Sequence, residues 1–336
     1  MPARTRRTSI SDVASHAGVS VGTVSNVLNR PDRVSPSTRD RVEAAITELA
    51  FVRNGSARQL RAGRITTVGA IVLDISNPFF TDVTRGIEER LTLDDHTLMV
   101  ASSDRDPERE SRYLRLFEEH GVRGVMVVPT TESVEHLLAA RDRGIRVVLL
   151  DHPSPVESVS SVAVDDVHGA TLAVRHLIDQ GHERIVFLNG PHAILQCADR
   201  LTGARKAVRD AGLDPETALT EIPVSLDADG GETGIRAMLA GGSATAVFCV
   251  SDLVALGALR TLRREGVSVP DDVALVGYDD VTFAAELATP LTSVRQPRHE
   301  LGVRAADLML RDPDEPAEQV LFSPELVVRE STVGRV

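Results

Sequence analysis

Charged side chains follow several of the short apolar runs in this 336-residue chain. Asp151 comes directly after the run 147–150, and Asp279 comes directly after the segment ALVGY. Arg200 opens the segment RLTGAR. Carboxylates and guanidinium groups can form paired hydrogen bonds with vicinal hydroxyls. These three residues are therefore candidates for binding a polyhydroxyl ligand, although an aspartate after a strand can also be a helix cap or a turn residue.

Two aromatic residues, Phe79 and Phe80, come just after the apolar run 68–75. Aromatic faces stack on sugar rings and on bases, which makes both residues candidates for contacting the same ligand. The alternative is that the two rings belong to the hydrophobic core.

The chain lacks the motifs of the common α/β enzymes. There is no G-x-x-x-x-G-K-[ST] loop, no strand-linked G-x-G-x-x-G and no G-x-S-x-G elbow after a predicted strand. Its two cysteines, Cys197 and Cys249, indicate neither a disulfide framework nor a metal site. We therefore expect no catalytic activity, no cofactor and no bound metal.

Strand-like and helical patterns alternate over most of the chain. Short apolar runs separated by helical periodicity are typical of parallel βαβ units, and they predict an α/β fold with parallel sheets. The runs form a first series at 68–75, 98–101, 125–128 and 147–150, and a second series at 162–164, 185–188, 222–224, 246–250 and 273–276.

The first 64 residues have a different pattern. Apolar residues recur at helical spacing over 10–17, 20–28 and 36–49. Ser9 and Ser20 occupy N-cap positions, and Pro36 is the first residue of the third segment. Gly18 allows a tight turn between the first two segments. This arrangement predicts a helix-turn-helix with a third, supporting helix.

Charge separates this head from the rest of the chain. Residues 1–64 contain 11 Arg, no Lys and 5 Asp or Glu, a net charge of +6. The whole chain has a net charge of −12, so the remaining residues carry −18. A basic head on an acidic body predicts binding of a polyanion at one end only.

Nine segments spread over the whole chain match one pattern in order. They are SISDVASHAGVSVGTVSNVLN (9–29), VSPSTRDRVEAAITELAF (34–51), NGSARQLRAGR (54–64), DISNPFF (74–80), GHERIVFLNGP (181–191), RLTGAR (200–205), VFCVSDLVALGAL (247–259), PDDVALVGYDD (270–280) and TSVRQP (292–297). Together these segments resemble the LacI/GalR family of transcription regulators. The family has a helix-turn-helix head, a hinge helix and a two-subdomain core like the periplasmic sugar-binding proteins, and its members are usually dimers on near-palindromic operators.

The resemblance implies which residues of the head contact DNA. Val21, Gly22 and Asn26 hold the positions that usually touch base edges. Asn26 can pair bidentately with adenine, Val21 offers only methyl contacts, and Gly22 has no side chain. Polar positions that usually bind phosphate, several of which are also helix caps, are Ser9, Thr23, Ser25, Asn29, Ser35 and Thr38.

Residues 54–64 resemble the family's hinge helix. Leu60 matches the leucine that is wedged into the minor groove, and such a wedge kinks the duplex. Arg58 and Arg61 are placed to meet phosphates or the floor of the minor groove.

The predicted hinge departs from the family at three positions. Arg53 stands where a proline is usual, and Gly55 and Ser56 stand where better helix formers or apolar contacts are common. Gly55 costs a helix about 1 kcal/mol relative to alanine. Whether the two hinges of a dimer pair as in the family is therefore an open question.

The resemblance also implies domain boundaries. Three chain crossings between the subdomains are expected near 156–161, 289–294 and 322–325. We expect a head at 1–53, a hinge at 54–64 and an effector-binding core at 65–336, with an N-subdomain at 65–158 and 293–322 and a C-subdomain at 159–290 and 323–332.

The effector is expected in the cleft between the two subdomains. Ser251 replaces the asparagine that is common before the aspartate of this motif, and we interpret Asp252 as a structural residue. Ile194 stands where the purine-responsive branch has an arginine, which favours a sugar over a purine. The candidate effector-binding residues are Phe79, Phe80, Asp151, Arg200, Ser251 and Asp279.

We expect a cytoplasmic regulator of transcription, a repressor that binds double-stranded operator DNA and a small-molecule effector as a homodimer. The N-terminus MPARTRRTSI has no apolar h-region, and no run of 18 apolar residues occurs, so neither secretion nor a membrane span is predicted. Three alternatives stay open: a purine-responsive or activating regulator of the same family, a sugar-binding protein without a regulatory role, and an enzyme on the same scaffold.

Overall fold

A computed structural model of the chain describes residues 8–51, 65–242 and 244–333. The chain divides into two compact units, a head within Met1–Ile65 and a core within Thr66–Val336. The predicted hinge, with Arg58, Leu60 and Arg61, lies outside the described residues.

The head is a small bundle of helices around one apolar core. The buried residues Val13, Val24 and Val42 come from three different helices and pack together. Ser9 and Asp12 form a capping box, in which the Asp12 amide donates to Ser9 Oγ and the Ser9 amide donates to Asp12 Oδ2. The helices are α1 (Ile10–Ala17), α2 (Val21–Asn29), the short 3₁₀ helix η1 (Pro31–Arg33) and α3 (Pro36–Glu48).

The turn between α1 and α2 depends on Gly18. This residue has φ 61°, in the left-handed region, and its amide bonds to the carbonyls of Ala14 and Ser15. Glycine adopts this conformation without the steric penalty of a Cβ atom. The chain can therefore turn sharply into α2, as the sequence predicts for a helix-turn-helix.

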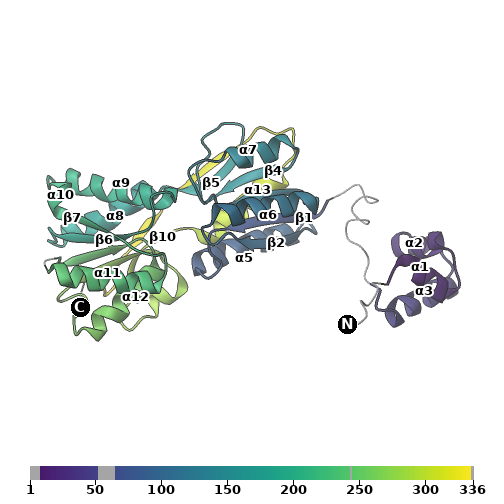
Figure 1. Cartoon of the computed structure of the whole chain (residues 1–336), viewed down its shortest axis with the longest axis horizontal. Coiled ribbons are helices and arrows are strands. Elements are labelled where there is room, and N and C mark those ends of the chain that lie inside the picture. The colour runs from purple at the N-terminus through teal and green to yellow at the C-terminus, as the bar shows by residue number, and fades with distance from the viewer. Residues whose placement is uncertain (1–7, 52–64, 243, 334–336) are drawn as a thin grey trace. The chain divides into compact units, whose positions relative to one another are not determined.

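In its described residues, the core contains two six-stranded sheets (Figure 1). The first sheet is parallel throughout and has the order β11-β5-β4-β3-β1-β2. With its helices it forms what we call the first subdomain. Its elements are β1 (Thr67–Val72), α5 (Pro78–Thr92), β2 (Thr97–Ser102), α6 (Pro107–Glu119), β3 (Gly124–Val127), α7 (Glu135–Asp142), β4 (Arg146–Leu150), β5 (Ser160–Val164), α13 (Arg298–Leu310) and β11 (Gln319–Phe322).

The second sheet has the order β12-β10-β9-β8-β6-β7, and β12 is antiparallel to β10 while the other pairs are parallel. It belongs to the second subdomain. The elements are α8 (Asp166–Asp179), β6 (Ile185–Asn189), α9 (Leu195–Asp210), α10 (Pro215–Ala218), β7 (Leu219–Pro223), α11 (Ala228–Gly241), β8 (Ala246–Cys249), α12 (Asp252–Arg264), β9 (Ala274–Asp279), η2 (Thr282–Ala285), β10 (Thr292–Arg295) and β12 (Glu325–Val327).

Both faces of the first sheet are covered by helices. Val68 and Ala70 of β1 belong to the core cluster that contains residues of α5 and α13. Their neighbour Ile71 belongs to a second cluster, with Leu114 of α6 and Leu137 of α7. Burial on both faces explains why these strands are continuous apolar runs rather than alternating patterns.

Helices α5 and α13 pack with their backbones in close approach. A Cβ atom added at Gly86 would lie 2.1 Å from the carbonyl oxygen of His299, and one added at Gly302 would lie 2.0 Å from that of Val83. The two glycines therefore bring the start of α13 against α5.

The strand pairing corrects two of the predicted boundaries between the subdomains. The predicted C-subdomain includes residues 159–164, but β5 pairs with β4 and β11 in the first sheet. The predicted N-subdomain includes residues 293–295, but β10 lies in the second sheet. An apolar run contains no information about which sheet it joins, because strand partners are determined by long-range packing.

The crossings between the subdomains follow from this pairing. The chain leaves each sheet after the strand has ended, close to Asp165 and Gln296 rather than at 156–161 and 289–294. It crosses a third time between Phe322 and Glu325.

Candidate DNA-binding surface and effector site

Helix α2 has an exposed face and a buried face. Val24 and Val27 are buried, whereas Val21, Gly22 and Asn26 are exposed. A Cβ atom at Gly22 would meet only Ser20 Oγ, at 3.6 Å, so this part of the helix surface has open space. The three residues predicted to touch bases therefore lie on the outward face, where a helix can enter a major groove.

The start of α2 is fixed by local hydrogen bonds. The amide of Thr23 donates to Ser20 Oγ at 3.0 Å, and the two hydroxyls lie 2.9 Å apart. The first exposed turn is thus stabilised by an N-cap.

The side chains predicted to bind phosphate also make local contacts. Asn29 Nδ2 donates to the carbonyl of Ser25 at 2.9 Å, and Ser35 Oγ donates to Thr38 Oγ1 at 2.9 Å. Ser9 caps α1. Ser9 Oγ also donates to Asp12 Oδ2 at 2.7 Å. The hydroxyl protons of Ser9 and Ser35 are therefore both in use, and a hydroxyl contact from either residue to a phosphate requires that hydroxyl to rotate.

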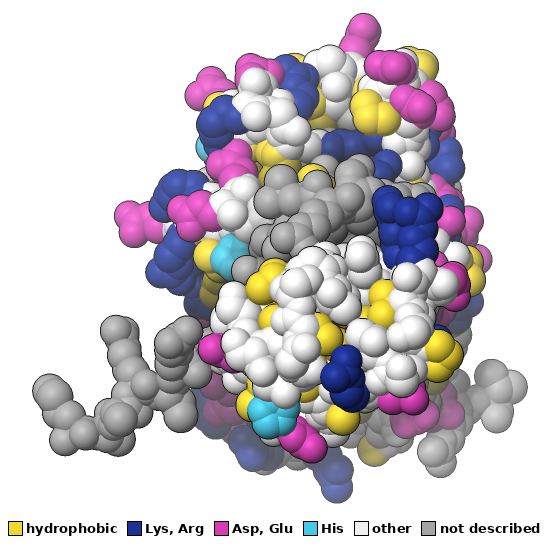
Figure 2. Space-filling view, turned by 90° about the vertical axis from the view of Figure 1, so that its right-hand side faces the viewer, with side chains coloured by type: hydrophobic (Ala, Val, Ile, Leu, Met, Phe, Trp, Pro, Cys, Tyr) yellow, Lys and Arg dark blue, Asp and Glu magenta, His cyan; other side chains and the backbone are white. Residues whose placement is uncertain are grey.

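The helical part of the head is not itself basic. Residues 8–51 contain four Arg and five Asp or Glu, and the seven other arginines of the head lie in 1–7 and 53–64. Figure 2 accordingly shows few basic side chains on the face of the head turned toward the viewer. The positive charge of the head therefore comes from the segments that flank the three helices.

In the core, Asp151 lies where the two subdomains meet. It follows β4 of the first sheet with φ 51°, and its side chain is buried. Gln196, in the first turn of α9 in the second subdomain, donates from Nε2 to Asp151 Oδ2 at 3.0 Å and to the Asp151 carbonyl. Sequence reasoning missed Gln196, because a glutamine four residues before Arg200 has no distinctive signal by itself.

Arg200 is fully enclosed in the second subdomain. Its Nε donates to Asp166 Oδ1 at 2.7 Å, and its Nη1 donates to the carbonyl of Val250 at 2.5 Å. Its Cζ lies 3.6 Å from the centroid of the Tyr278 ring. Asp166 is absent from the predicted site residues, although an aspartate just after β5 is the kind of signal that identifies Asp151.

Asp279, the last residue of β9, is the third candidate near this buried guanidinium. It has φ 106° and is 3% exposed, and its Oδ1 accepts from Gln296 Nε2 at 2.8 Å. Burial raises its pKa to about 6, against the opposing effect of the nearby Arg200. Burial and the charge of Asp166 also raise the pKa of Asp151 well above its usual range.

Three carboxylates, those of Asp151, Asp166 and Asp279, therefore lie around one guanidinium, that of Arg200. Three acceptors of this group, Asp151 Oδ1, Gln196 Oε1 and Gln296 Oε1, have no hydrogen-bond partner among the described residues. A buried acceptor without a partner is costly. Hydrogen-bond donors on a ligand would satisfy these oxygens.

The remaining candidates have structural positions. The Phe79 and Phe80 rings are 2% and 6% exposed and pack edge to face in the first subdomain, with centroids 5.0 Å apart. Ser251 caps α12 and accepts from the amide of Val254. Asp252 is buried and accepts from the amide of Val281 at 2.9 Å and from Ser293 Oγ at 2.6 Å, which agrees with its interpretation as a structural residue.

Neither a metal cluster nor a membrane span occurs in the described part of the chain. Its residues hold no group of three or more His, Cys, Asp or Glu side chains that could bind a metal ion. None of the described helices is long and apolar enough to span a membrane.

A helix-turn-helix head followed by a two-subdomain α/β core defines a DNA-binding regulator with a periplasmic-binding-protein-like domain. The model for bacterial regulatory proteins of the lacI family matches residues 9–54, and the model for the periplasmic binding protein-like domain matches residues 174–332. The chain belongs to the lacI family of transcriptional regulators.

Two relatives match over nearly their whole length. The HTH-type transcriptional regulator DegA of Bacillus subtilis is 32% identical over 97% of this chain and 98% of its own. The HTH-type transcriptional repressor PurR of Aliivibrio fischeri is 30% identical over 97% of this chain and 99% of its own.

Solved structures show the same architecture. The regulator CelR in complex with cellobiose is 33% identical with a TM-score of 0.72, over 97% of this chain and all of its own. A LacI family regulator from Enterococcus faecium with bound ribose is 28% identical with a TM-score of 0.73, over 80% of this chain and 100% of its own. The lac repressor dimer bound to operator and the anti-inducer ONPF is 26% identical with a TM-score of 0.79, over 98% and 100%.

Proposed function

We propose that this protein is a repressor whose affinity for a specific operator is controlled by a sugar bound between the two core subdomains. The observation that carries the proposal is the buried cluster of Asp151, Gln196, Arg200 and Asp279, which draws on both subdomains and keeps acceptors available for hydroxyl donors. Vicinal hydroxyls can donate to carboxylate and amide oxygens and accept from a guanidinium. The cellobiose and ribose complexes of two relatives support this ligand class.

A purine effector is the second candidate, because several repressors named PurR are among the relatives. A purine also has donors and acceptors on its edges, and it would need a flat apolar face to stack on. Phe79 and Phe80 are enclosed by core residues, and Ile194 is buried at the start of α9. The polar cluster therefore favours the sugar.

The operator complex is proposed to be dimeric, on a near-palindromic site in cytoplasmic DNA. One recognition helix covers one half-site, and two-fold symmetry of the protein is matched by two-fold symmetry of the DNA. The lac repressor relative is a dimer on its operator.

The test uses the full chain in two stages. Selection from a random DNA library should enrich a two-fold symmetric sequence, and fluorescence anisotropy then measures affinity for it with ribose, cellobiose and other sugars, or with adenine and guanine. A sugar should change the affinity at least about tenfold, a typical coupling between two sites, and Asp279→Ala should abolish this change. Failure to enrich any sequence would overturn the proposal that the protein binds a specific operator. A response to purines alone would overturn the proposal that the effector is a sugar.

A further inference from the structure

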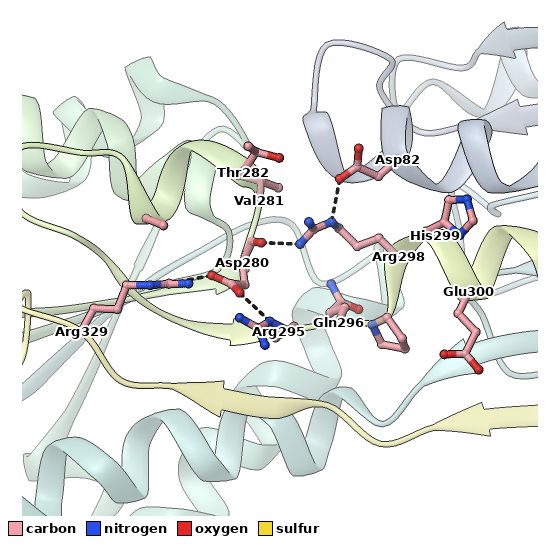
Figure 3. Close-up of a pocket in the computed structure, with 12 residues that line it drawn as sticks. Asp82, Asp280, Val281, Thr282, Arg295, Gln296, Arg298, His299, Glu300 and Arg329 are labelled. Carbon is pink, nitrogen blue, oxygen red and sulfur yellow. Dashed lines mark hydrogen bonds and ion pairs between the residues drawn. The ribbon is translucent and has the colours of Figure 1, made fainter.

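Arg298 is the first residue of α13, directly after the chain has left the second sheet. Strand β10 ends at Arg295, and three residues later the chain enters α13, a helix that packs against α5 in the first subdomain. Arg298 therefore lies at the crossing between the two subdomains. It lines a pocket of about 510 Å³, in which its guanidinium points back toward the end of β9 (Figure 3).

The guanidinium of Arg298 contacts both subdomains. Its Nε donates to Asp82 Oδ2 at 2.9 Å, and Asp82 belongs to α5 of the first subdomain. Its Nη1 donates to the main-chain carbonyls of Asp279 and Asp280, which follow one another at the end of β9 in the second subdomain. The close approach of α5 and α13 at Gly86 holds Asp82 and Arg298 beside each other.

The turn that Arg298 contacts has an unusual backbone. Asp279 has φ 106° and Asp280 has φ 49°, conformations that L-residues rarely adopt and that persist only where surrounding contacts hold them. Within the second subdomain, Arg295 and Arg329 pair with the two carboxylate oxygens of Asp280 at 2.7 and 2.6 Å. The contacts of Arg298 tie the same turn to the first subdomain.

These contacts depend on how the two subdomains are placed. The Arg298 side chain is 16% exposed, and its charge is balanced by Asp82 and by two carbonyl dipoles. Hydrogen bonds from a charged donor are stronger than neutral ones. Rotation of one subdomain against the other would separate Arg298 from the two carbonyls, and an interaction that differs between two arrangements shifts the equilibrium between them.

We propose that Arg298 is a positioning residue that holds the Asp279–Asp280 turn against the first subdomain. By doing so it fixes the relative placement of the two subdomains and the position of the Asp279 carboxylate in the effector site. Its part in effector control rests on the function proposed above, whereas its effect on subdomain placement does not.

The test compares Arg298→Met with Arg295→Met in the full chain. Methionine keeps much of the aliphatic length of arginine and removes the donors. Arg295 is a matched control, because it lines the same pocket and pairs with the same aspartate, but its partners Asp280 and Glu325 both lie in the second subdomain. Spin labels on cysteines introduced at the exposed positions Leu93 and Ala237 report the distance between the subdomains. Labelled protein is mixed with an excess of unlabelled protein, so that only distances within one chain are measured, and neither operator nor effector is needed.

The parent and Arg295→Met should give the same single, narrow distance distribution. Arg298→Met should give a shifted or second distance, and Arg298→Lys should restore part of the parent distribution, because an ammonium still donates to carbonyls. If Arg298→Met does not fold, Asp82→Asn replaces it; this change removes the carboxylate that orients the guanidinium and should produce a smaller shift in the same direction. A distribution identical to that of the parent in the folded variant, even with a lower melting temperature, overturns the proposal.

Discussion

Asn26 is the residue of the head whose chemistry best suits base recognition. It is exposed on α2, on the side opposite the buried Val24 and Val27. An amide offers a donor and an acceptor at the spacing of the adenine N6 and N7 edge. Its neighbours on this face, Val21 and Gly22, offer no hydrogen-bonding side chain, so Asn26 is the one of these three predicted base-contacting residues that could discriminate bases through side-chain hydrogen bonds.

We therefore expect Asn26→Ala to weaken binding to the selected operator by about 1–3 kcal/mol and to relax the preference at one base pair. Thr23→Ala should weaken binding to all sequences alike, because phosphate contacts do not read sequence. Anisotropy titrations on the operator and on its single-base variants measure both effects. Equal losses across all variants for Asn26→Ala would show that it does not read a base.

Arg200 has a structural importance that its sequence position does not reveal. Its partners Asp166, Val250 and Tyr278 are all buried in the second subdomain. Removing one member of a buried ion pair leaves the other charge unpaired, at a cost of about 3–5 kcal/mol. Arg200→Met should therefore lower the free energy of unfolding by this amount, and Arg200→Met with Asp166→Asn should recover part of it. Urea denaturation of both variants measures the difference; if the double variant is no more stable than Arg200→Met, the unpaired charge of Asp166 is not the source of the loss.

Asp279 should make stability depend on pH. Its pKa is raised from 3.8 to about 6 by burial, so the folded chain binds a proton more tightly than the unfolded chain. The stability that this proton confers is fully present below about pH 4 and is lost as the pH rises through about 6. The free energy of unfolding of the parent, relative to Asp279→Asn, should therefore increase as the pH falls from 7 to 5. Asp229→Asn, at an exposed side chain, is the control, and parallel pH profiles of the parent and Asp279→Asn would contradict the assignment.

At the scale of elements, the packing of α5 on α13 determines where the crossing segment lies. Gly86→Ala places a methyl group 2.1 Å from a main-chain carbonyl, and this carbonyl cannot move without shifting the helix. We expect a loss of about 1–3 kcal/mol of stability, typical of overpacking. Gly241→Ala is the matched control, because a Cβ atom there has nothing within 4 Å. Thermal denaturation compares the two, and an equal effect would show that the helices can separate at little cost.

At the scale of the whole molecule, the head has a net positive charge and the remainder of the chain has a net negative charge. Seven of the eleven arginines of the head flank its three helices, and the remainder of the chain carries −18. Counterion release should make operator binding fall steeply with salt. Replacing Arg4, Arg6 and Arg7 with glutamine should lower the slope of log affinity against log salt by up to about 0.9 for each phosphate that is no longer neutralised. Arg236→Gln in the core should leave the slope unchanged; a flat response in the parent would contradict a phosphate-dominated interface.

The sequence alone determined the features that depend on local order. Helical spacing and caps at Ser9 and Ser20 predict the head, because a short helix is specified by its own residues. The apolar runs predict strands and an α/β core, and the family resemblance predicts the regulator; the structure and the relatives confirm both.

Tertiary structure decided which distant residues meet. It placed β5 in the first sheet and β10 in the second. It also paired Arg200 with Asp166 and formed the hydrogen bond between Gln196 and Asp151, residues that lie far apart in the chain. Arg298 is another such case, since its partners Asp82 and Asp279 come from different subdomains. No local pattern predicts these pairs, because they depend on how two separately formed sheets pack and on which buried charges need a partner.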